Sequence, residues 1–131
     1  MDQEVLVEQK EQEGRRLIEA LDAANLGPSA AFWFYQPDVS QWRLMVTGPG
    51  LDAGAKDPTE PYRKIANVLN NLVPTASALS ISDLKVIGQR DPLLAVMGGI
   101  VRTGKGLTSI RMQNNAVNGI HIADALVYRM A

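Results

Sequence analysis

The sequence predicts an α+β fold in which helices pack on a mixed sheet of about five strands. Three patterns indicate this fold. Apolar residues recur at helical spacing over residues 9–25, an aromatic-rich hairpin follows over residues 30–47, and two strand–helix–strand crossovers complete the order α-β-β-α-β-α-β-β. The 131 residues are close to the most common domain size, so we expect one domain over residues 1–131.

The first helix is expected over Gln9–Asn25. Its apolar stripe consists of Leu17, Ile18, Leu21 and Ala24. Gly27 suits the left-handed position after a helix and Pro28 cannot continue one, so this pair marks the end. Residues 1–13 are polar, with charge on most sides of the helix, and we expect these first turns to be frayed.

The hairpin pairs Ala30–Gln36 with Trp42–Thr47 across a turn that contains Pro37 and Asp38. In the second strand, alternate residues face opposite sides. Trp42, Leu44 and Val46 share one face, and Arg43, Met45 and Thr47 share the other. The aromatic side chains and Arg43 are also residue types that stack on bases or sugars. A domain with so few aromatics is expected to use them in its core instead.

Two further helices begin with the same signal, an aspartate followed by a proline. Asp57–Pro58 starts a helix that ends before Pro74, and a strand is expected next over Leu79–Ile87. Asp91–Pro92 starts a third helix over Leu93–Val101, although the apolar run there also fits a strand. The chain then closes with two strands around an Asn-rich turn, over Leu107–Met112 and Ile120–Met130.

Composition narrows the classes of function. The formal net charge is −1, whereas a protein that binds nucleic acid without sequence specificity carries an excess of positive charge. Nucleic acid is therefore a disfavoured partner. The lack of cysteine excludes disulfides, thiolate metal sites and cysteine nucleophiles. We find no apolar run of the ~18 residues that a membrane span needs and no secretory signal pattern. We therefore expect no membrane association and a cytoplasmic location.

Charge is unevenly distributed along the chain. Residues 1–22 hold seven acidic and three basic side chains, whereas residues 84–131 hold six basic and two acidic ones. The simpler interpretation is two solvated faces that favour solubility. The alternative is that the acidic segment lies against the basic one, in the same chain or in a neighbouring copy.

Three stretches resemble a family of small uncharacterised bacterial proteins. They are the hairpin AFWFYQPDVSQWRLMV, the Gly-rich loop with the helix start PYRKI, and the C-terminal segment NNAVNGIHIADALVYRM. The resemblance covers most of the chain and implies a bacterial origin and an intact small domain. It implies no activity and no catalytic residue.

The candidate catalytic residues are Asp83 and Lys85. An acid-x-Lys element on a strand is found in metal-dependent nucleases, where the carboxylate holds Mg²⁺ and the lysine steadies the attacking water. Asp38 would be a second acid, but it lies far away in sequence. Alternating polar residues on a half-exposed strand give the same pattern, so a second ligand close in space is required.

The candidate binding residues are Arg43, Arg102, Lys105 and His121. Arg102 and Lys105 lie in Gly99–Gly106, which has the spacing of a phosphate loop but glycine where that motif needs Ser or Thr; a helix end with glycine turns is the structural interpretation. His121 is the only histidine, and a polar position on an open sheet face is favoured over a metal ligand. We expect no metal and no cofactor.

Two classes of function remain open. The first is a non-enzymatic protein-interaction or accessory module of a bacterial cytoplasmic complex, with a homodimer as one form of it. It is favoured because no complete catalytic constellation is present. The alternative is a metal-dependent phosphoesterase or nuclease-like enzyme that uses Asp83 and Lys85.

Overall fold

The computed structural model describes residue 6 and residues 8–51, 59–72, 79–117 and 119–131. Within them, the helices and strands follow the predicted order, and the α+β fold is confirmed. The helices are α1 (Glu8–Ala23), α2 (Glu60–Asn70) and α3 (Pro92–Ile100), with short 3-10 turns at η1 (Pro49–Leu51) and η2 (Ile81–Asp83). The strands are β1 (Ala30–Gln36), β2 (Gln41–Thr47), β3 (Leu84–Val86), β4 (Ile110–Val117) and β5 (Ile120–Met130).

The five strands form one mixed sheet in the order β3-β2-β1-β5-β4. β2 and β3 are parallel, and the other neighbours are antiparallel. The register between β1 and β5 shifts after Ala31, so Tyr128 is an extra residue opposite the β1 strand. This bulge lies near the end of β5, beside the residues that form the candidate site below.

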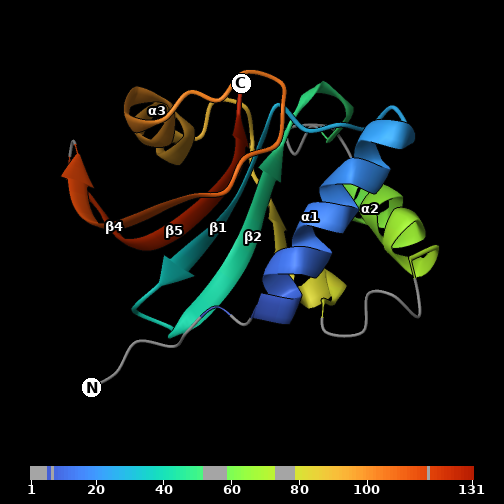
Figure 1. The fold of residues 1–131 in the computed structure, drawn as a ribbon, viewed down its shortest axis with the longest axis horizontal. Coiled ribbons are helices and arrows are strands. Elements are labelled where there is room, and N and C mark those ends of the chain that lie inside the picture. Colours follow the sequence, from blue (N-terminus) through green and yellow to red (C-terminus); the bar gives the residue numbers. More distant parts are fainter. Residues whose placement is uncertain (1–5, 7, 52–58, 73–78, 118) are drawn as a thin grey trace.

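Helices cover both faces of the sheet, with α1 and α2 on one side and α3 on the other (Figure 1). Two hydrophobic clusters result, because successive strand residues point to opposite faces. The larger cluster contains Trp33, Trp42, Leu44, Val46 and Tyr128 with the apolar side chains of α1 and α2. The hairpin aromatics therefore belong to the core, and the predicted facing of Trp42, Leu44 and Val46 is confirmed.

The first helix ends two residues earlier than predicted, and it uses a different residue to do so. Asn25, with φ of 61°, takes the left-handed position that we assigned to Gly27. The Leu26 N–H donates to the Leu21 carbonyl oxygen at 2.8 Å and the Asn25 N–H to Asp22 at 3.1 Å, which is the Schellman pattern. Residues 8–13, which we expected to fray, are helical, and Glu13 is buried.

The region before β3 differs from the strand predicted over Leu79–Ile87. Residues 81–83 form η2, and only Leu84–Val86 pair with β2. The cause is local, because the Ser80 N–H donates to the Asp83 carboxylate at 2.9 Å and the Asp83 N–H donates back to the Ser80 carbonyl at 3.0 Å. Side chain–backbone bonds of this kind compete with strand pairing.

The ambiguous segment 93–101 is a helix, as preferred from its start signal. Asp91 caps α3 by accepting a hydrogen bond from the Leu93 N–H at 2.9 Å, with Pro92 in the first turn. The corresponding signal at Asp57–Pro58 lies outside the described residues, as does Pro74 after α2. The described part of α2 begins after Thr59 and carries Pro61 in its first turn.

The fourth strand extends through the Asn-rich segment that we expected to be a turn. β4 runs over Ile110–Val117 instead of Leu107–Met112, and β5 has the predicted bounds Ile120–Met130. Asn114 adopts a φ of 55° within β4, a conformation that asparagine tolerates better than most residues. Asparagine is typical of turns, which led us to predict a turn here. In the structure Asn114 lies within β4 and distorts the backbone of that strand.

The helix α1 contacts the sheet at Gly14. The Trp33 indole N–H donates to the Tyr128 hydroxyl at 2.9 Å, and that hydroxyl donates to the Glu11 carbonyl oxygen. A Cβ placed on Gly14 would lie 2.8 Å from the Tyr128 oxygen and 3.0 Å from the indole nitrogen. The absence of a side chain at this position therefore sets how closely α1 approaches the sheet.

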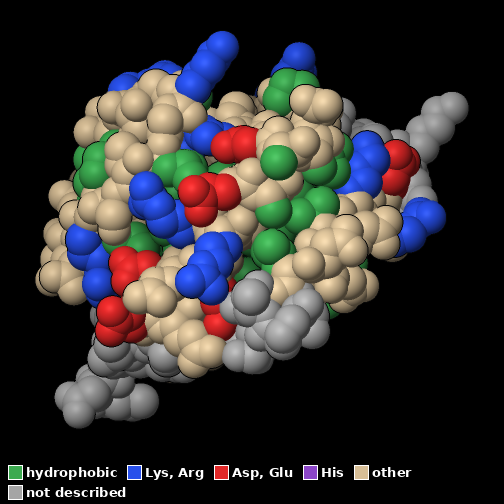
Figure 2. Space-filling model, turned by 45° about the vertical axis from the view of Figure 1, so that its right-hand side comes forward, with side chains coloured by type: hydrophobic (Ala, Val, Ile, Leu, Met, Phe, Trp, Pro, Cys, Tyr) green, Lys and Arg blue, Asp and Glu red, His purple; other side chains and the backbone are tan. Residues whose placement is uncertain are grey.

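The acidic and basic ends of the chain do meet within one molecule. Asp22 at the end of α1 forms an ion pair with Arg129 of β5 at 2.8 Å, and the Arg15 guanidinium donates to the Thr108 carbonyl at 3.1 Å. On the side that carries α1 and α2, acidic and basic side chains are interspersed (Figure 2). Among the described helices, none has the length and apolar composition to cross a bilayer.

We predict that Gly14→Ala destabilises the protein by ~1–3 kcal/mol, because the added methyl group overpacks against Tyr128 and Trp33. Gly99→Ala in α3 is the matched control, since a Cβ there meets nothing within 4 Å. Helix propensity favours alanine at both positions by ~1 kcal/mol, so the two variants should change in opposite directions in urea unfolding. Equal stabilisation of both would contradict the close approach of α1.

Candidate functional site

Two adjoining pockets lie at the C-terminal end of β5, and the first of them is beside α3. The first, which we call the α3 pocket, has a volume of about 300 Å³, and its walls include Thr47, Arg90, Leu94 and Arg102. The second, the proline pocket, has a volume of about 420 Å³, and its walls include Asp22, Pro28, Pro49, Lys105 and Arg129. Ser29 and Ala131 line both, so the two pockets share a wall.

Four separate segments bring cations to these pockets. Arg90 precedes the Asp91 cap of α3, Arg102 follows the end of that helix, and Arg129 belongs to β5. Lys105 follows Gly104, whose φ of 72° lets the chain turn beside the end of β5. This arrangement cannot be predicted from the sequence, because the segments come together only in the folded chain.

Backbone oxygens hold Arg102 in place. Its Nε donates to the Gly98 carbonyl at 3.1 Å, and its Nη1 donates to the Ala131 carbonyl at 3.0 Å. The guanidinium is exposed, and one of its N–H groups already binds an oxygen that lines the α3 pocket. Arg102 is therefore oriented to donate to oxygen ligands there.

Arg129 is buried and paired. Its two terminal nitrogens bind both Asp22 oxygens at 2.9 and 2.8 Å, and Nη1 also binds the Pro28 carbonyl at 3.0 Å. The hydrogen bonds from Arg129 lower the pKa of Asp22 despite partial burial of the carboxylate. This pair fixes the end of α1 against β5 and forms one side of the proline pocket.

The pockets carry an excess of positive charge. Of the side chains that line them, four are cations and two, those of Asp22 and Asp91, are carboxylates, and both of these carboxylates are engaged. Arg90 and Lys105 are exposed and form no ion pair or hydrogen bond with the described residues. Asp91 neutralises the start of α3, so the attraction for an anion comes from the arginine and lysine side chains and not from the helix end.

Each pocket also contains a buried polar atom with no partner among the described residues. These atoms are Thr47 Oγ1 in the wall of the α3 pocket and Arg129 Nε in the wall of the proline pocket. Nearly all buried polar groups in proteins have a hydrogen-bond partner. The two atoms lie at the same end of the sheet but on opposite faces, because Thr47 points to the side of α3 and Arg129 reaches Asp22 of α1.

Of the four predicted binding residues, the structure brings two together. Arg102 and Lys105 line the adjoining pockets, whereas Arg43 lies on β2 and His121 is exposed on β5 opposite Ala116. Arg43 donates to the Ser82 carbonyl at 3.3 Å and to Gln41 at 3.2 Å. Sequence reasoning missed Arg90 and Arg129, since neither belongs to a motif.

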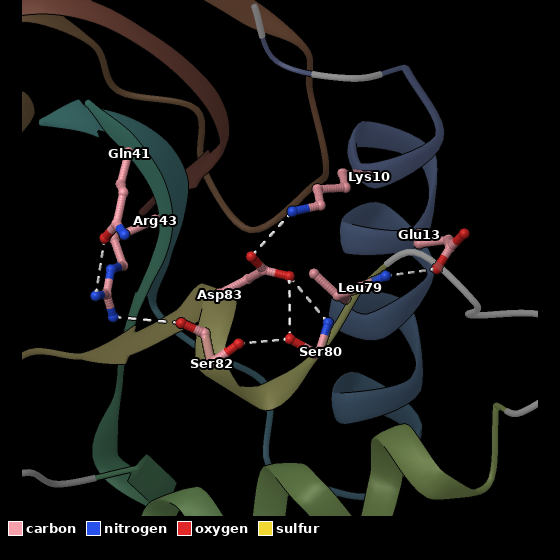
Figure 3. A network of polar contacts seen from close by, with 8 residues as sticks. All are labelled: Lys10, Glu13, Gln41, Arg43, Leu79, Ser80, Ser82 and Asp83. Carbon is pink, nitrogen blue, oxygen red and sulfur yellow. Dashed lines mark hydrogen bonds and ion pairs between the residues drawn. The ribbon is translucent and has the colours of Figure 1, made fainter. Parts of the chain in front are cut away.

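Asp83 is part of a local polar network and not of a catalytic strand (Figure 3). Its carboxylate accepts from the Ser80 N–H and from Lys10 Nζ at 3.1 Å, and so closes η2 and ties it to α1. Lys85 is exposed on β3. The described residues contain no group of three His, Asp or Glu side chains that could hold a metal ion. Among the described residues, Asp83 is therefore not part of a cluster that could hold a metal ion.

A second carboxylate, Asp124 on β5, is also fully engaged. Burial would raise the pKa of Asp124, but hydrogen bonds from Arg111 and Gln113 outweigh burial and lower it. Arg111 binds both carboxylate oxygens at 2.5 Å and lies 5.5 Å from the centre of the Trp42 ring. The pair packs against the aromatic hairpin and serves the fold.

Comparison with known proteins found no matching family model, no matching curated protein and no matching solved structure. The predicted membership of a family of small bacterial proteins therefore stays a prediction.

We predict that Asp83→Ala lowers the stability by ~1–2 kcal/mol, because the Ser80 N–H and Lys10 lose their partner. Lys85→Ala should change the stability by less than ~0.5 kcal/mol, since the side chain is exposed. Urea unfolding with and without millimolar Mg²⁺ checks both points. A Mg²⁺-dependent stabilisation that Asp83→Ala abolishes would restore the metal-site hypothesis.

Proposed function

We propose that the protein is a non-enzymatic interaction module that binds an acidic segment of a partner protein at the α3 and proline pockets. The observation that carries this proposal is the convergence of Arg90, Arg102, Lys105 and Arg129 on one end of the sheet. Arginine clusters on a surface are a recurrent means of recognising acidic and phosphorylated motifs.

Partner recognition fits these pockets better than catalysis does. Arg90 and Lys105 have no anionic partner among the described residues, and Arg102 already donates to an oxygen in the α3 pocket. The two carboxylates present are a helix cap and half of an ion pair, so neither is available as a general base. What remains is a set of donors that suits carboxylate oxygens, of which Arg102 and Arg129 are held by hydrogen bonds.

A second copy of this chain is one form of the partner, since residues 1–22 are themselves acidic. Association through sheet edges is less favoured by the structure. The described edge strand β3 has only three residues, and Asn114 distorts β4 in its middle. Short or distorted edges resist strand addition. A homodimer would therefore use charge complementarity at the pockets.

We expect a capped tetraglutamate peptide to bind at the pockets and a capped tetraglutamine peptide not to bind. Amide NMR shifts during the titration should centre on Ser29, Arg90, Arg102 and Ala131. Arg90→Gln/Lys105→Gln should weaken binding about threefold to tenfold, since each exposed charge pair contributes ~0.2–1 kcal/mol. Added salt should weaken binding further, because the charges are exposed.

The matched control is Arg16→Gln/Lys85→Gln, which removes the same two charges from exposed positions outside both pockets. Equal weakening by both double variants would show that binding follows net charge and would overturn the proposal. Light scattering of the intact chain, before and after tetraglutamate, identifies the partner. A dimer that the peptide dissociates would make a second copy the partner, whereas a monomer that binds the peptide indicates a different protein.

A further inference from the structure

We infer that the acidic group received by the α3 pocket is a phosphoryl group on a side chain of the partner. The inference rests on the proposed function and names the chemistry of its ligand. It concerns this pocket alone, because Thr47 and α3 lie on one face of the sheet, whereas Arg129 of the proline pocket reaches Asp22 of α1 on the other.

The wall of the α3 pocket contains a hydroxyl group that the fold does not use. Thr47 is 1% exposed, and its Oγ1 has no hydrogen-bond partner among the described residues. Its backbone carbonyl already accepts from the Ser29 N–H at 2.8 Å, so the side chain is the part of Thr47 left to bind. A buried hydroxyl without a partner is rare, and a ligand oxygen that accepts from it would remove the exception.

The guanidinium of Arg102 is held at the same pocket by two backbone oxygens. These are the carbonyl oxygens of Gly98 and Ala131, and both residues line the pocket. A Cβ on Gly98 would lie 3.6 Å from Arg102 Cζ, so the guanidinium packs against the helix at a residue that has no side chain. A guanidinium has more donors than these two bonds use, and the others remain for a ligand.

Arg90 brings a second guanidinium from the opposite end of α3. It is exposed and lines the pocket just before the Asp91 cap. Asp91 is the one carboxylate among the described side chains that line this pocket, and it accepts from the Leu93 N–H. The positive end of the helix dipole offsets part of its charge. The α3 pocket therefore keeps an excess of positive charge.

A phosphoryl group uses these donors more fully than a carboxylate does. It carries a charge of about −1.5 to −2 and three acceptor oxygens, whereas a carboxylate has one charge and two oxygens. Three separate segments supply the donors, through Thr47, Arg90 and Arg102. The volume of about 300 Å³ suits one side chain, and Leu94 and Met130 give its stem an apolar wall.

The test compares three capped four-residue peptides in NMR titrations of the full chain. The first has one phosphoserine among alanines, the second has two adjacent glutamates and so nearly the same net charge, and the third has an unmodified serine. We expect phosphoserine to bind about tenfold more tightly than the glutamate pair, the equivalent of one further charge-assisted hydrogen bond, and serine not to bind. Amide shifts should centre on Thr47, Arg90 and Arg102.

Thr47→Val separates binding from folding. It removes a hydroxyl that the folded chain leaves unpaired, so the urea midpoint should not fall, whereas the affinity for phosphoserine should fall about fivefold. Thr108→Val is the matched control, because that hydroxyl donates to two β5 carbonyl oxygens at 3.1 Å and lies outside the α3 pocket. Its urea midpoint should fall, and its affinity should not change.

The charge is tested with a second pair of variants. Arg102→Gln should weaken phosphoserine binding about tenfold or more, because it removes charge-assisted donors from the pocket. Arg16→Gln removes the same charge from an exposed position outside both pockets and should change the affinity by less than about twofold.

Each other outcome overturns a defined part. Equal binding of the phosphoserine and glutamate peptides would overturn the phosphoryl group and leave the acidic interaction module intact. Failure of both to bind would overturn the proposed function itself. Inorganic phosphate that binds as tightly as the phosphoserine peptide would overturn the assignment to a partner's side chain. Displacement of the phosphoserine peptide by equimolar oligothymidylate would replace the protein partner by a nucleic acid and overturn both proposals.

Discussion

The packing of α1 on the sheet is the constraint on which the rest of the structure depends. At one point the helix carries no side chain, and Gly14 lets the backbone approach Tyr128 and Trp33. The indole N–H, the Tyr128 hydroxyl and the Glu11 carbonyl form one chain of hydrogen bonds through this contact. Burial raises the pKa of Tyr128, so the phenol stays protonated and continues to donate.

The same contact positions the candidate site. Tyr128 is the bulged residue of β5, and Arg129 follows it directly. With α1 held at Gly14, the last turn of the helix brings Asp22 to Arg129, and that ion pair forms a wall of the proline pocket. A shift of α1 would therefore alter the proline pocket as well as the core. The packing of α1 and the proline pocket therefore depend on the same end of β5.

Local signals predicted most elements, whereas non-local contacts decided the differences. The aspartate–proline start of α3 and the alternation in β2 are specific patterns, and both predictions were confirmed. The strand predicted from Leu79 begins only at Leu84, because the Asp83 carboxylate caps η2. This cap is visible only in the hydrogen bonds of the structure. Arg102 was predicted as a binding residue because it lies in a segment that nearly matches the phosphate-loop motif. Arg90 and Arg129 had no such signal, because the pockets exist only after distant segments meet.

The most direct measurement is a double-mutant cycle on stability with Trp33→Phe and Tyr128→Phe. Tyr128→Phe alone leaves the buried indole N–H without its acceptor, at a cost of ~1–3 kcal/mol. The cycle removes the separate packing effects of each substitution. We predict a coupling of about 1 kcal/mol or more between the two residues. Additive effects would contradict the claim that this hydrogen-bond chain fixes α1 on the sheet.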